Sequence, residues 1–231
     1  MSLKQIKVIG FDADDTLWVN EPYFQDAGKQ FCRLLKPYIH DMEITAKELF
    51  KTEINNLGLY GYGVKAFILS MIETAIRITG GKIKGEEIGS ILEMGNAILN
   101  MPITLLDDVE TVLKKLQPHY LFILVTKGDL LDQERKLQMS GLINYFHHIE
   151  IVSDKHEDNY RKLLMHLNIK PEEFLMVGNS VKSDILPVIN IGAQAIHVPF
   201  EVTWQHEIIH DLDGANNFAT ISRLSELLKI L

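Results

Sequence analysis

Two aspartates near the start of the chain are the first residues whose types and spacing could carry out chemistry. Asp12 and Asp14 lie in the stretch Asp12-Ala13-Asp14-Asp15-Thr16, directly after the apolar residues 6–11. Residues two apart in an extended segment point the same way, so both carboxylates could reach a single phosphorus atom. One carboxylate could attack the phosphorus while the other transfers a proton. Two neighbouring carboxylates also repel each other, which favours a proton on one of them.

Three further groups of polar residues follow short apolar runs later in the chain. They are Thr126-Lys127-Gly128, Ser153-Asp154-Lys155, and Gly178-Asn179-Ser180 followed by Asp184. If the apolar runs are parallel strands, their carboxyl ends share one edge of a sheet, where ligands bind. Mg²⁺ prefers oxygen ligands, so one or two carboxylates, a backbone carbonyl and a phosphate oxygen would suffice to hold it. The four segments together predict one site for magnesium and phosphate.

These residues can be positioned by an α/β domain that carries a helical insert. After residue 102, helical patterns such as residues 109–116 alternate with apolar runs of strand length, which predicts an open, three-layer parallel sheet of Rossmann-like type. The runs are residues 6–11, 120–125, 149–152, 174–177 and 195–198. From residue 22 to residue 99, apolar residues recur at helical spacing, with breaks near residues 58–63 and 80–81. We expect about four helices there, and a terminal helix over residues 221–231.

The chain length and this pattern predict two domains. A chain of 231 residues has room for one core and a smaller appendage. We expect residues 1–18 and 101–231 to form the α/β core domain. Residues 19–100 would form a small, all-helical domain inserted into it, with hinges near residues 17–22 and 100–102.

The composition excludes several classes of partner. The chain has 23 Lys and Arg against 31 Asp and Glu, a formal net charge of -8 that would repel a nucleic-acid backbone. A single cysteine, Cys32, excludes an intramolecular disulfide and fits a reducing cytoplasm. No stretch approaches the roughly 20 apolar residues needed to cross a bilayer. We therefore expect a cytoplasmic monomer or homodimer that binds neither nucleic acid nor membrane.

The motifs and their order resemble the haloacid dehalogenase (HAD) superfamily, which consists mainly of magnesium-dependent phosphatases. Residues 11–17 match the first motif of that family, a hydrophobic strand followed by Asp-x-Asp-x-Thr. The resemblance implies that Asp12 is a nucleophile that forms an aspartyl-phosphate. It implies that Asp14 protonates the leaving alcohol and then activates water. It also implies that the helical insert is a mobile cap, which would restrict the substrate to a small phosphorylated metabolite.

The remaining motifs of the family can be matched residue by residue. Thr126 matches the second motif, in which a hydroxyl and the following backbone N–H, here that of Lys127, hold the phosphoryl oxygens. Ala13 and Asp14 would also contact the phosphoryl group. Lys155 best matches the third motif and would neutralise charge between the phosphate and Asp12; Lys127, Lys162 and Lys182 are the competing lysines.

The fourth motif departs from the family pattern. Relatives usually place an acidic residue directly after the glycine as a magnesium ligand, whereas this chain has Asn179 after Gly178. The amide oxygen of Asn179 can still coordinate a hard cation, and Asp184 restores a negative charge five residues later. Asp184 could ligate the metal, bind a coordinated water or orient Lys155. The expected metal ligands are Asp12, Asp14, Asn179 and Asp184.

Three other functions stay open at this stage. A 2-haloacid dehalogenase is disfavoured by Asp14, because a halide leaving group needs no proton whereas an alkoxide does. A phosphomutase would use the same residues to pass the phosphoryl group to a second hydroxyl. A binding protein with weakened catalysis is suggested by the neutral Asn179.

Overall fold

The computed structural model describes residues 3, 5–209 and 218–231. The chain divides into two compact units. The first, here the core unit, comprises Met1–Glu21 and Ile103–Leu231, and the second, here the helical unit, is Pro22–Pro102.

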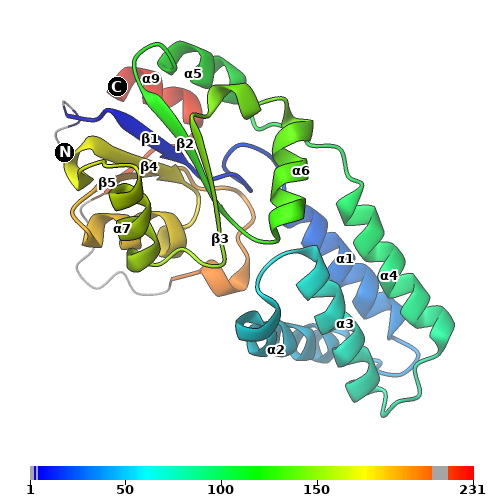
Figure 1. Ribbon diagram of the computed structural model, residues 1–231. Coiled ribbons are helices and arrows are strands. Elements are labelled where there is room, and N and C mark those ends of the chain that lie inside the picture. The colour runs from blue at the N-terminus through cyan, green and yellow to red at the C-terminus, as the bar shows by residue number, and fades with distance from the viewer. Residues whose placement is uncertain (1–2, 4, 210–217) are drawn as a thin grey trace. The chain divides into compact units, whose positions relative to one another are not determined.

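The core unit is built on a parallel sheet (Figure 1). Its strands are β1 (Val8–Phe11), β2 (Leu121–Lys127), β3 (His148–Val152), β4 (Phe174–Gly178), β5 (Gln194–His197) and β6 (Ala219–Thr220). They lie in the order β3-β2-β1-β4-β5-β6, with every neighbouring pair parallel. The α/β fold and the five expected strands are confirmed. The sixth strand, β6, was not predicted, because two residues are too few to show a periodic pattern.

Helices cover both faces of this sheet, which makes the core unit a three-layer structure (Figure 1). On one face, Ile9 and Phe11 of β1 pack with α5 (Val109–Leu116), α6 (Leu130–Ser140) and α9 (Leu227–Ile230). On the other face, Val8 packs with α7 (Glu157–His166) and α8 (Leu186–Asn190). A strand buried on both faces needs apolar residues throughout, and this explains the continuous apolar runs in the sequence.

The terminal helix is shorter than its apolar spacing predicts. Helix α9 begins only at Leu227, after a single helical turn over Leu224–Glu226. The backbone N–H and the hydroxyl of Ser222 both donate to the carboxylate of Glu226, so the chain turns there before the helix starts. Ile221, Leu224 and Leu227 are nevertheless buried in the core. The spacing therefore predicted burial correctly and helix length wrongly.

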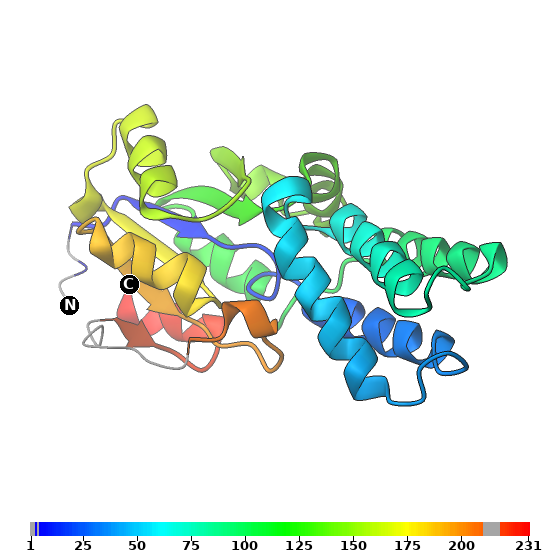
Figure 2. The ribbon, with the colours of Figure 1, turned by 90° about the horizontal axis from the view of Figure 1, so that it is seen from below.

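The helical unit consists of four helices, which share their own hydrophobic core; their ribbons are coloured blue to green in Figure 2. They are α1 (Glu21–Leu34), whose first residue belongs to the core unit, α2 (Met42–Tyr60), α3 (Val64–Ile78) and α4 (Gly85–Leu99). Gly61, Gly80 and Gly81 have positive φ angles in the two expected breaks, where left-handed backbone favours glycine. None of the helices in the described parts of the chain combines the length and apolar character that crossing a membrane requires.

The core unit retains residues 19–21, which the sequence pattern had placed in the insert. The buried carboxylate of Asp15 accepts hydrogen bonds from the backbone N–H groups of Asn20, at 2.8 Å, and Glu21, at 2.9 and 3.1 Å. Asp15 itself has a positive φ of 62°. The turn after β1 is therefore tied to the chain that leaves the core unit.

A close contact between α3 and α4 gives a test of the packing in the helical unit. A Cβ atom added at Gly95 of α4 would lie 2.5 Å from Cγ1 of Ile68 in α3, whereas one added at Gly89 would meet nothing within 4 Å. We expect Gly95→Ala to lower the free energy of unfolding by about 1–3 kcal/mol through overpacking. Gly89→Ala, the matched control, should raise it by up to about 1 kcal/mol through better helix propensity. Chemical denaturation measures both, and equal effects of the two variants would contradict the contact.

Candidate active site

Three buried charges meet at the carboxyl edge of the sheet. Asp12 follows β1, Lys155 follows β3, and Asp184 lies in the helical turn Val181–Ile185 after β4. The Nζ of Lys155 is 2.5 Å from Oδ1 of Asp12 and 2.7 Å from Oδ1 of Asp184. All three residues are at most 6% exposed. The structure thus brings together three sequence-predicted residues as an ion-paired cluster.

Burial and mutual repulsion perturb the charges in this cluster. Burial and then the carboxylate of Asp184 raise the pKa of Asp12 to about 7, against the attraction of Lys155. Burial opposes the charge on Lys155, but the carboxylates of Asp12 and Asp184 outweigh it and raise the pKa of that lysine. The cluster therefore holds two acidic groups against one ammonium group and could accept a further cation.

The position of Asp184 depends on the glycine that ends β4. A Cβ atom at Gly178 would lie 2.3 Å from Oδ2 of Asp184, so only glycine leaves room for this carboxylate. That same Oδ2 accepts the backbone N–H of Ser180 at 3.0 Å, while Oδ1 accepts from Lys155. With both oxygens engaged, Asp184 is placed to orient Lys155.

Asn179 and Asp12 are connected through the hydroxyl of Thr16. The Oγ1 of Thr16 donates to Oδ2 of Asp12 at 3.0 Å and lies 3.4 Å from Oδ1 of Asn179. Carboxylate and amide oxygens are the hard donors that Mg²⁺ prefers, so this pair fits a magnesium ion. Among the described residues, no group of three or more His, Cys, Asp or Glu side chains is arranged to hold a metal. The donor set thus depends on the amide of Asn179.

The carboxylate of Asp14 has a different set of partners from that of Asp12. Lys136 contacts its two oxygens at 2.6 and 2.7 Å, the indole Nε1 of Trp18 donates to Oδ1 at 2.7 Å, and Nε2 of Gln133 donates to Oδ2 at 2.9 Å. The chain does not stay extended here, because the carbonyl of Ala13 accepts the N–H of Leu17 at 2.8 Å. The first motif therefore leads into a turn over Ala13–Leu17, and the carboxylate of Asp14 is engaged by Lys136, Trp18 and Gln133.

The second-motif residues lie at the end of β2, next to β1. Phe11 is in register with Leu124 of β2 and with Val177 of β4, so Asp12, Thr126 and Asn179 all follow within two residues of that level. Thr126 is buried, at 1% exposed. These segments therefore converge as the sequence predicted.

The side chain of Lys127 is held by a carboxylate that the sequence analysis did not identify. Its Nζ lies 2.6 Å from Oε1 of Glu207 and 2.9 Å from Oγ of Ser183. The Oε2 of Glu207 accepts the hydroxyls of Ser180 and Ser183 at 2.5 and 2.6 Å. Burial opposes ionisation of Glu207, but the Lys127 ammonium group and these hydrogen bonds outweigh it and lower its pKa to about 2. This network connects the second and fourth motifs.

Three residues near the site were missed from the sequence: Gln133, Lys136 and Glu207. Gln133 and Lys136 are three apart in α6, so helical spacing places them on one face, but that face could be assigned only once the helix was packed. Glu207 lies in a short turn, Gln205–Glu207, that has no periodic pattern. The available signal in the sequence was that Gln133 and Lys136 are two polar residues three apart on the helix that follows the second motif.

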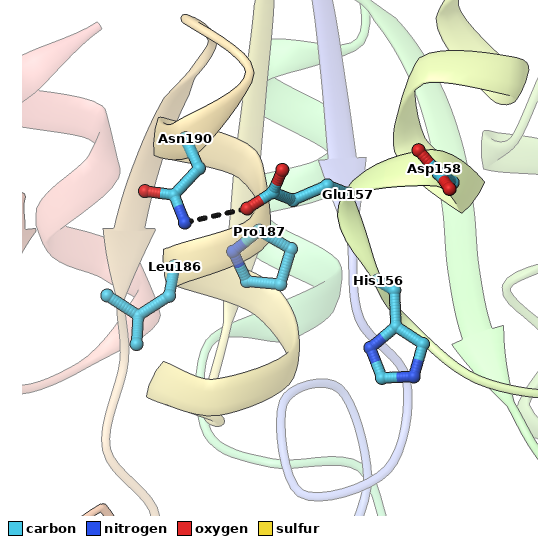
Figure 3. A pocket seen from close by; sticks show the side chains of 6 residues that line it. All are labelled: His156, Glu157, Asp158, Leu186, Pro187 and Asn190. Atoms are coloured by element: carbon cyan, nitrogen blue, oxygen red, sulfur yellow. Dashed lines mark hydrogen bonds between the residues drawn. The ribbon is translucent and has the colours of Figure 1, made fainter.

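A surface pocket of about 320 Å³ lies between the start of α7, directly after Lys155 in the sequence, and α8 (Figure 3). Its lining residues are His156, Glu157, Asp158, Leu186, Pro187 and Asn190. The side chain of Asn190 donates to Glu157 at 2.9 Å across it. None of the candidate site residues lines this pocket.

The network around Glu207 predicts a pH-dependent contribution to stability. A carboxyl whose pKa falls from 4.5 to about 2 on folding stabilises the protein fully above pH 4.5, and this stabilisation is lost as the pH falls from 4.5 towards 2. We expect Glu207→Gln to lower the free energy of unfolding at pH 7 by about 2–3 kcal/mol. The difference from wild type should shrink as the pH falls through that window.

Denaturant titrations between pH 2 and pH 7 measure this difference. Glu201→Gln removes an exposed carboxylate from the same segment and should change stability by less than about 0.5 kcal/mol. A Glu207→Gln deficit that stays constant down to pH 2 would show that the effect is not due to ionisation.

Comparisons with known proteins identify the family. Residues 6–192 match the haloacid dehalogenase-like hydrolases. A haloacid dehalogenase-like family hydrolase from Xanthomonas campestris is 38% identical, with a TM-score of 0.81, over 91% of this chain and 88% of that one. The glyceraldehyde 3-phosphate phosphatase of Pyrococcus furiosus is 25% identical over 84% of this chain and 81% of its own length. The human N-acylneuraminate-9-phosphatase is 23% identical over 84% and 83%.

The resemblance inferred from the four motifs is confirmed by these matches. The family match extends over residues 6–192 of 231, and the relative with 38% identity covers nearly the whole chain. The protein therefore belongs to the haloacid dehalogenase-like family and is a hydrolase.

Proposed function

We propose that this hydrolase is a magnesium-dependent phosphatase that cleaves a small phosphorylated metabolite through an aspartyl-phosphate on Asp12. The observation that carries the proposal is the buried carboxylate of Asp12, held between the ammonium group of Lys155 and the hydroxyl of Thr16 beside Asn179. A carboxylate fixed beside a cation at a strand end is suited to attack phosphorus once the charge of the phosphate is neutralised.

In the first step, a carboxylate oxygen of Asp12 forms a bond to phosphorus, and the ester P–O bond breaks. The electron pair of that bond goes to the leaving oxygen, which takes a proton from Asp14. Lys155 faces Asp12 at 2.5 Å and would stabilise negative charge on the phosphoryl oxygens. The hydroxyl of Thr126 and the N–H of Lys127, with Ala13 in the segment after β1, would orient those oxygens.

In the second step, water attacks the phosphorus of the aspartyl-phosphate. Asp14 takes a proton from that water, the bond from phosphorus to the Asp12 oxygen breaks, and inorganic phosphate leaves. The proton that Asp14 takes from water is the one that it donates to the leaving oxygen in the next turnover. The same two aspartates thus act in both steps, one as nucleophile and one as acid and base.

Magnesium, when bound, would supply positive charge beside Asp12 and the phosphoryl oxygens. Asp12 and Asn179 are the residues we propose to hold it, because Oδ2 of Asp12 and Oδ1 of Asn179 lie 3.0 and 3.4 Å from the same Thr16 hydroxyl. Asp184, expected as a possible ligand, accepts from Lys155 and from the backbone N–H of Ser180, and we assign it the role of orienting Lys155. The side chain of Asp14, also expected as a ligand, is engaged by Lys136, Trp18 and Gln133, which leaves its backbone carbonyl as the available donor.

The proposed substrate class is supported by the relatives and by the presence of the helical unit. Two relatives are named for glyceraldehyde 3-phosphate and N-acylneuraminate 9-phosphate, which are phosphorylated small metabolites. We assign the role of a mobile cap to the helical unit, Pro22–Pro102. A cap that excludes water strengthens the electrostatic interactions in the site and limits entry to small substrates. The single cysteine, Cys32, supports a reducing cytoplasm as its compartment.

The proposal predicts that Asp12 is indispensable. Asp12→Asn removes the nucleophilic charge, and we expect phosphate release to fall by at least about 10³-fold. Asp158→Asn, on the exposed surface of α7, is the control and should leave the rate unchanged. The assay is phosphate release with Mg²⁺ from a panel of sugar phosphates, nucleotides and phosphoglycolate. Activity that persists in Asp12→Asn would remove this residue as nucleophile, and chloride release from 2-haloacids without Mg²⁺ would instead indicate a dehalogenase.

A substitution at Asn179 distinguishes an active phosphatase from a binding protein with weakened catalysis. Asn179→Asp adds a charged ligand, so we expect tighter Mg²⁺ binding and a lower Mg²⁺ concentration for half-maximal activity. In an active phosphatase, the rate at saturating Mg²⁺ should change by less than about threefold. Titration of metal-free protein with Mg²⁺ measures both quantities. An inactive wild type that gains strong activity in Asn179→Asp would favour the weakened binding protein.

A further inference from the structure

Helix α6 directs a buried lysine at the carboxylate of Asp14. The Nζ of Lys136 lies 2.6 Å from Oδ1 and 2.7 Å from Oδ2 of Asp14, so it bridges both oxygens. Lys136 is 8% exposed, and its ammonium group also contacts Oδ1 of Asn20 at 3.2 Å. A buried lysine with one principal carboxylate partner is a costly arrangement that needs close geometry. The pair is therefore a built feature and not a surface ion pair.

The environment of Lys136 keeps its ammonium group in place. Helix α6 begins at Leu130, and the side chain of Asp129 accepts the N–H of Asp132 at its start. Leu137, the next residue after Lys136, is buried in the core of the sheet. One carboxylate oxygen of Asp132 lies 4.0 Å from Nζ of Lys136. The burial of Leu137 fixes the backbone of α6 next to Lys136, and the oxygens of Asp14, Asn20 and Asp132 surround the ammonium group. The ammonium group therefore has little freedom to move.

A neighbouring amide shows that this face of α6 is organised around Asp14. Gln133 is 4% exposed, and its Nε2 donates to Oδ2 of Asp14 at 2.9 Å and to the carbonyl of Lys127 at 3.2 Å. Its Oε1 is buried with no hydrogen-bond partner. An unsatisfied buried oxygen destabilises the fold, so an apolar residue would suit a purely structural role better. The amide nitrogen has to face the carboxylate, and this fixes its orientation.

We infer that Lys136 is a positioning residue, which holds the carboxylate of Asp14 for proton transfer and stabilises the negative charge that it acquires on giving up its proton. The inference rests on the proposed function, in which Asp14 protonates the leaving alcohol. When that proton moves to the leaving oxygen, negative charge develops on the two Asp14 oxygens that Lys136 contacts at 2.6 and 2.7 Å. An ammonium group already in place at that moment lowers the barrier without reorganisation.

The inference predicts an effect that depends on the leaving group. An alkoxide needs a proton in order to depart, whereas 4-nitrophenolate departs without one. The value of kcat/KM covers the steps up to the departure of the leaving group, so it isolates the first proton transfer from the hydrolysis of the aspartyl-phosphate. We expect Lys136→Met to lower kcat/KM for an alkyl phosphate by about 10- to 100-fold. For 4-nitrophenyl phosphate, kcat/KM should stay within about threefold of wild type.

Three further variants complete the experiment. Asp14→Asn removes the acid itself and should show the same selective loss with a larger magnitude. Lys136→Arg keeps a cation that can bridge both carboxylate oxygens and should recover part of the alkyl phosphate activity. Glu134→Gln removes an exposed charge from α6 two residues before Lys136 and should leave both substrates unchanged. Circular dichroism and thermal unfolding show that each variant is folded.

The outcomes separate this inference from the proposed function. A selective loss in Lys136→Met that Lys136→Arg partly reverses supports the inference. An equal loss for both substrates would assign Lys136 to phosphate binding or to folding and would overturn the inference, as would an unchanged or increased kcat/KM for the alkyl phosphate. If Lys136→Met does not fold, a Lys136→Arg variant that shows no selectivity overturns it. Failure of Asp14→Asn to show selectivity would reject the proposed acid itself, and the inference with it.

Discussion

The buried ammonium group of Lys155 is the interaction on which the rest of the site depends. It lies within 2.7 Å of oxygens of both Asp12 and Asp184, in a place where all three side chains are almost fully removed from water. Removing one partner of such a cluster would leave an uncompensated buried charge. The cluster can form only because β1, β3 and β4 are parallel and end at the same edge. The three charges can thus be buried together only because the fold places them next to one another.

The two aspartates of the first motif are two residues apart in sequence but occupy different environments. Asp12 shares Lys155 with another carboxylate, and its pKa is raised. Asp14 is surrounded by donors from Lys136, Trp18 and Gln133. Two carboxylates in distinct surroundings can take distinct chemical roles.

The sequence predicted the sheet and the convergence of its strand ends well, because both depend on local patterns. Apolar runs followed by polar residues located Asp12, Lys155 and Asn179 without knowledge of their contacts. The partners of Lys127 and Asp14 could not be predicted in the same way. Glu207 reaches Lys127 from a turn 80 residues away, and Lys136 reaches Asp14 across 122 residues. Such contacts depend on how α6 and the Gln205–Glu207 turn pack against the rest of the core unit. The local spacing of apolar and polar residues does not predict that packing.

The neutral residue at position 179 changes how a cation would be held. Of the acidic groups near the fourth motif, Asp184 is paired with Lys155 and the backbone N–H of Ser180, and Glu207 is paired with Lys127 and Ser180. A cation beside Asp12 would then meet one carboxylate and one amide from these side chains. Mg²⁺ needs six oxygen ligands and keeps several waters when the protein supplies few. In the proposed function, a phosphoryl oxygen of the substrate would be an anionic ligand that completes such a set, and this favours cooperative binding of metal and substrate.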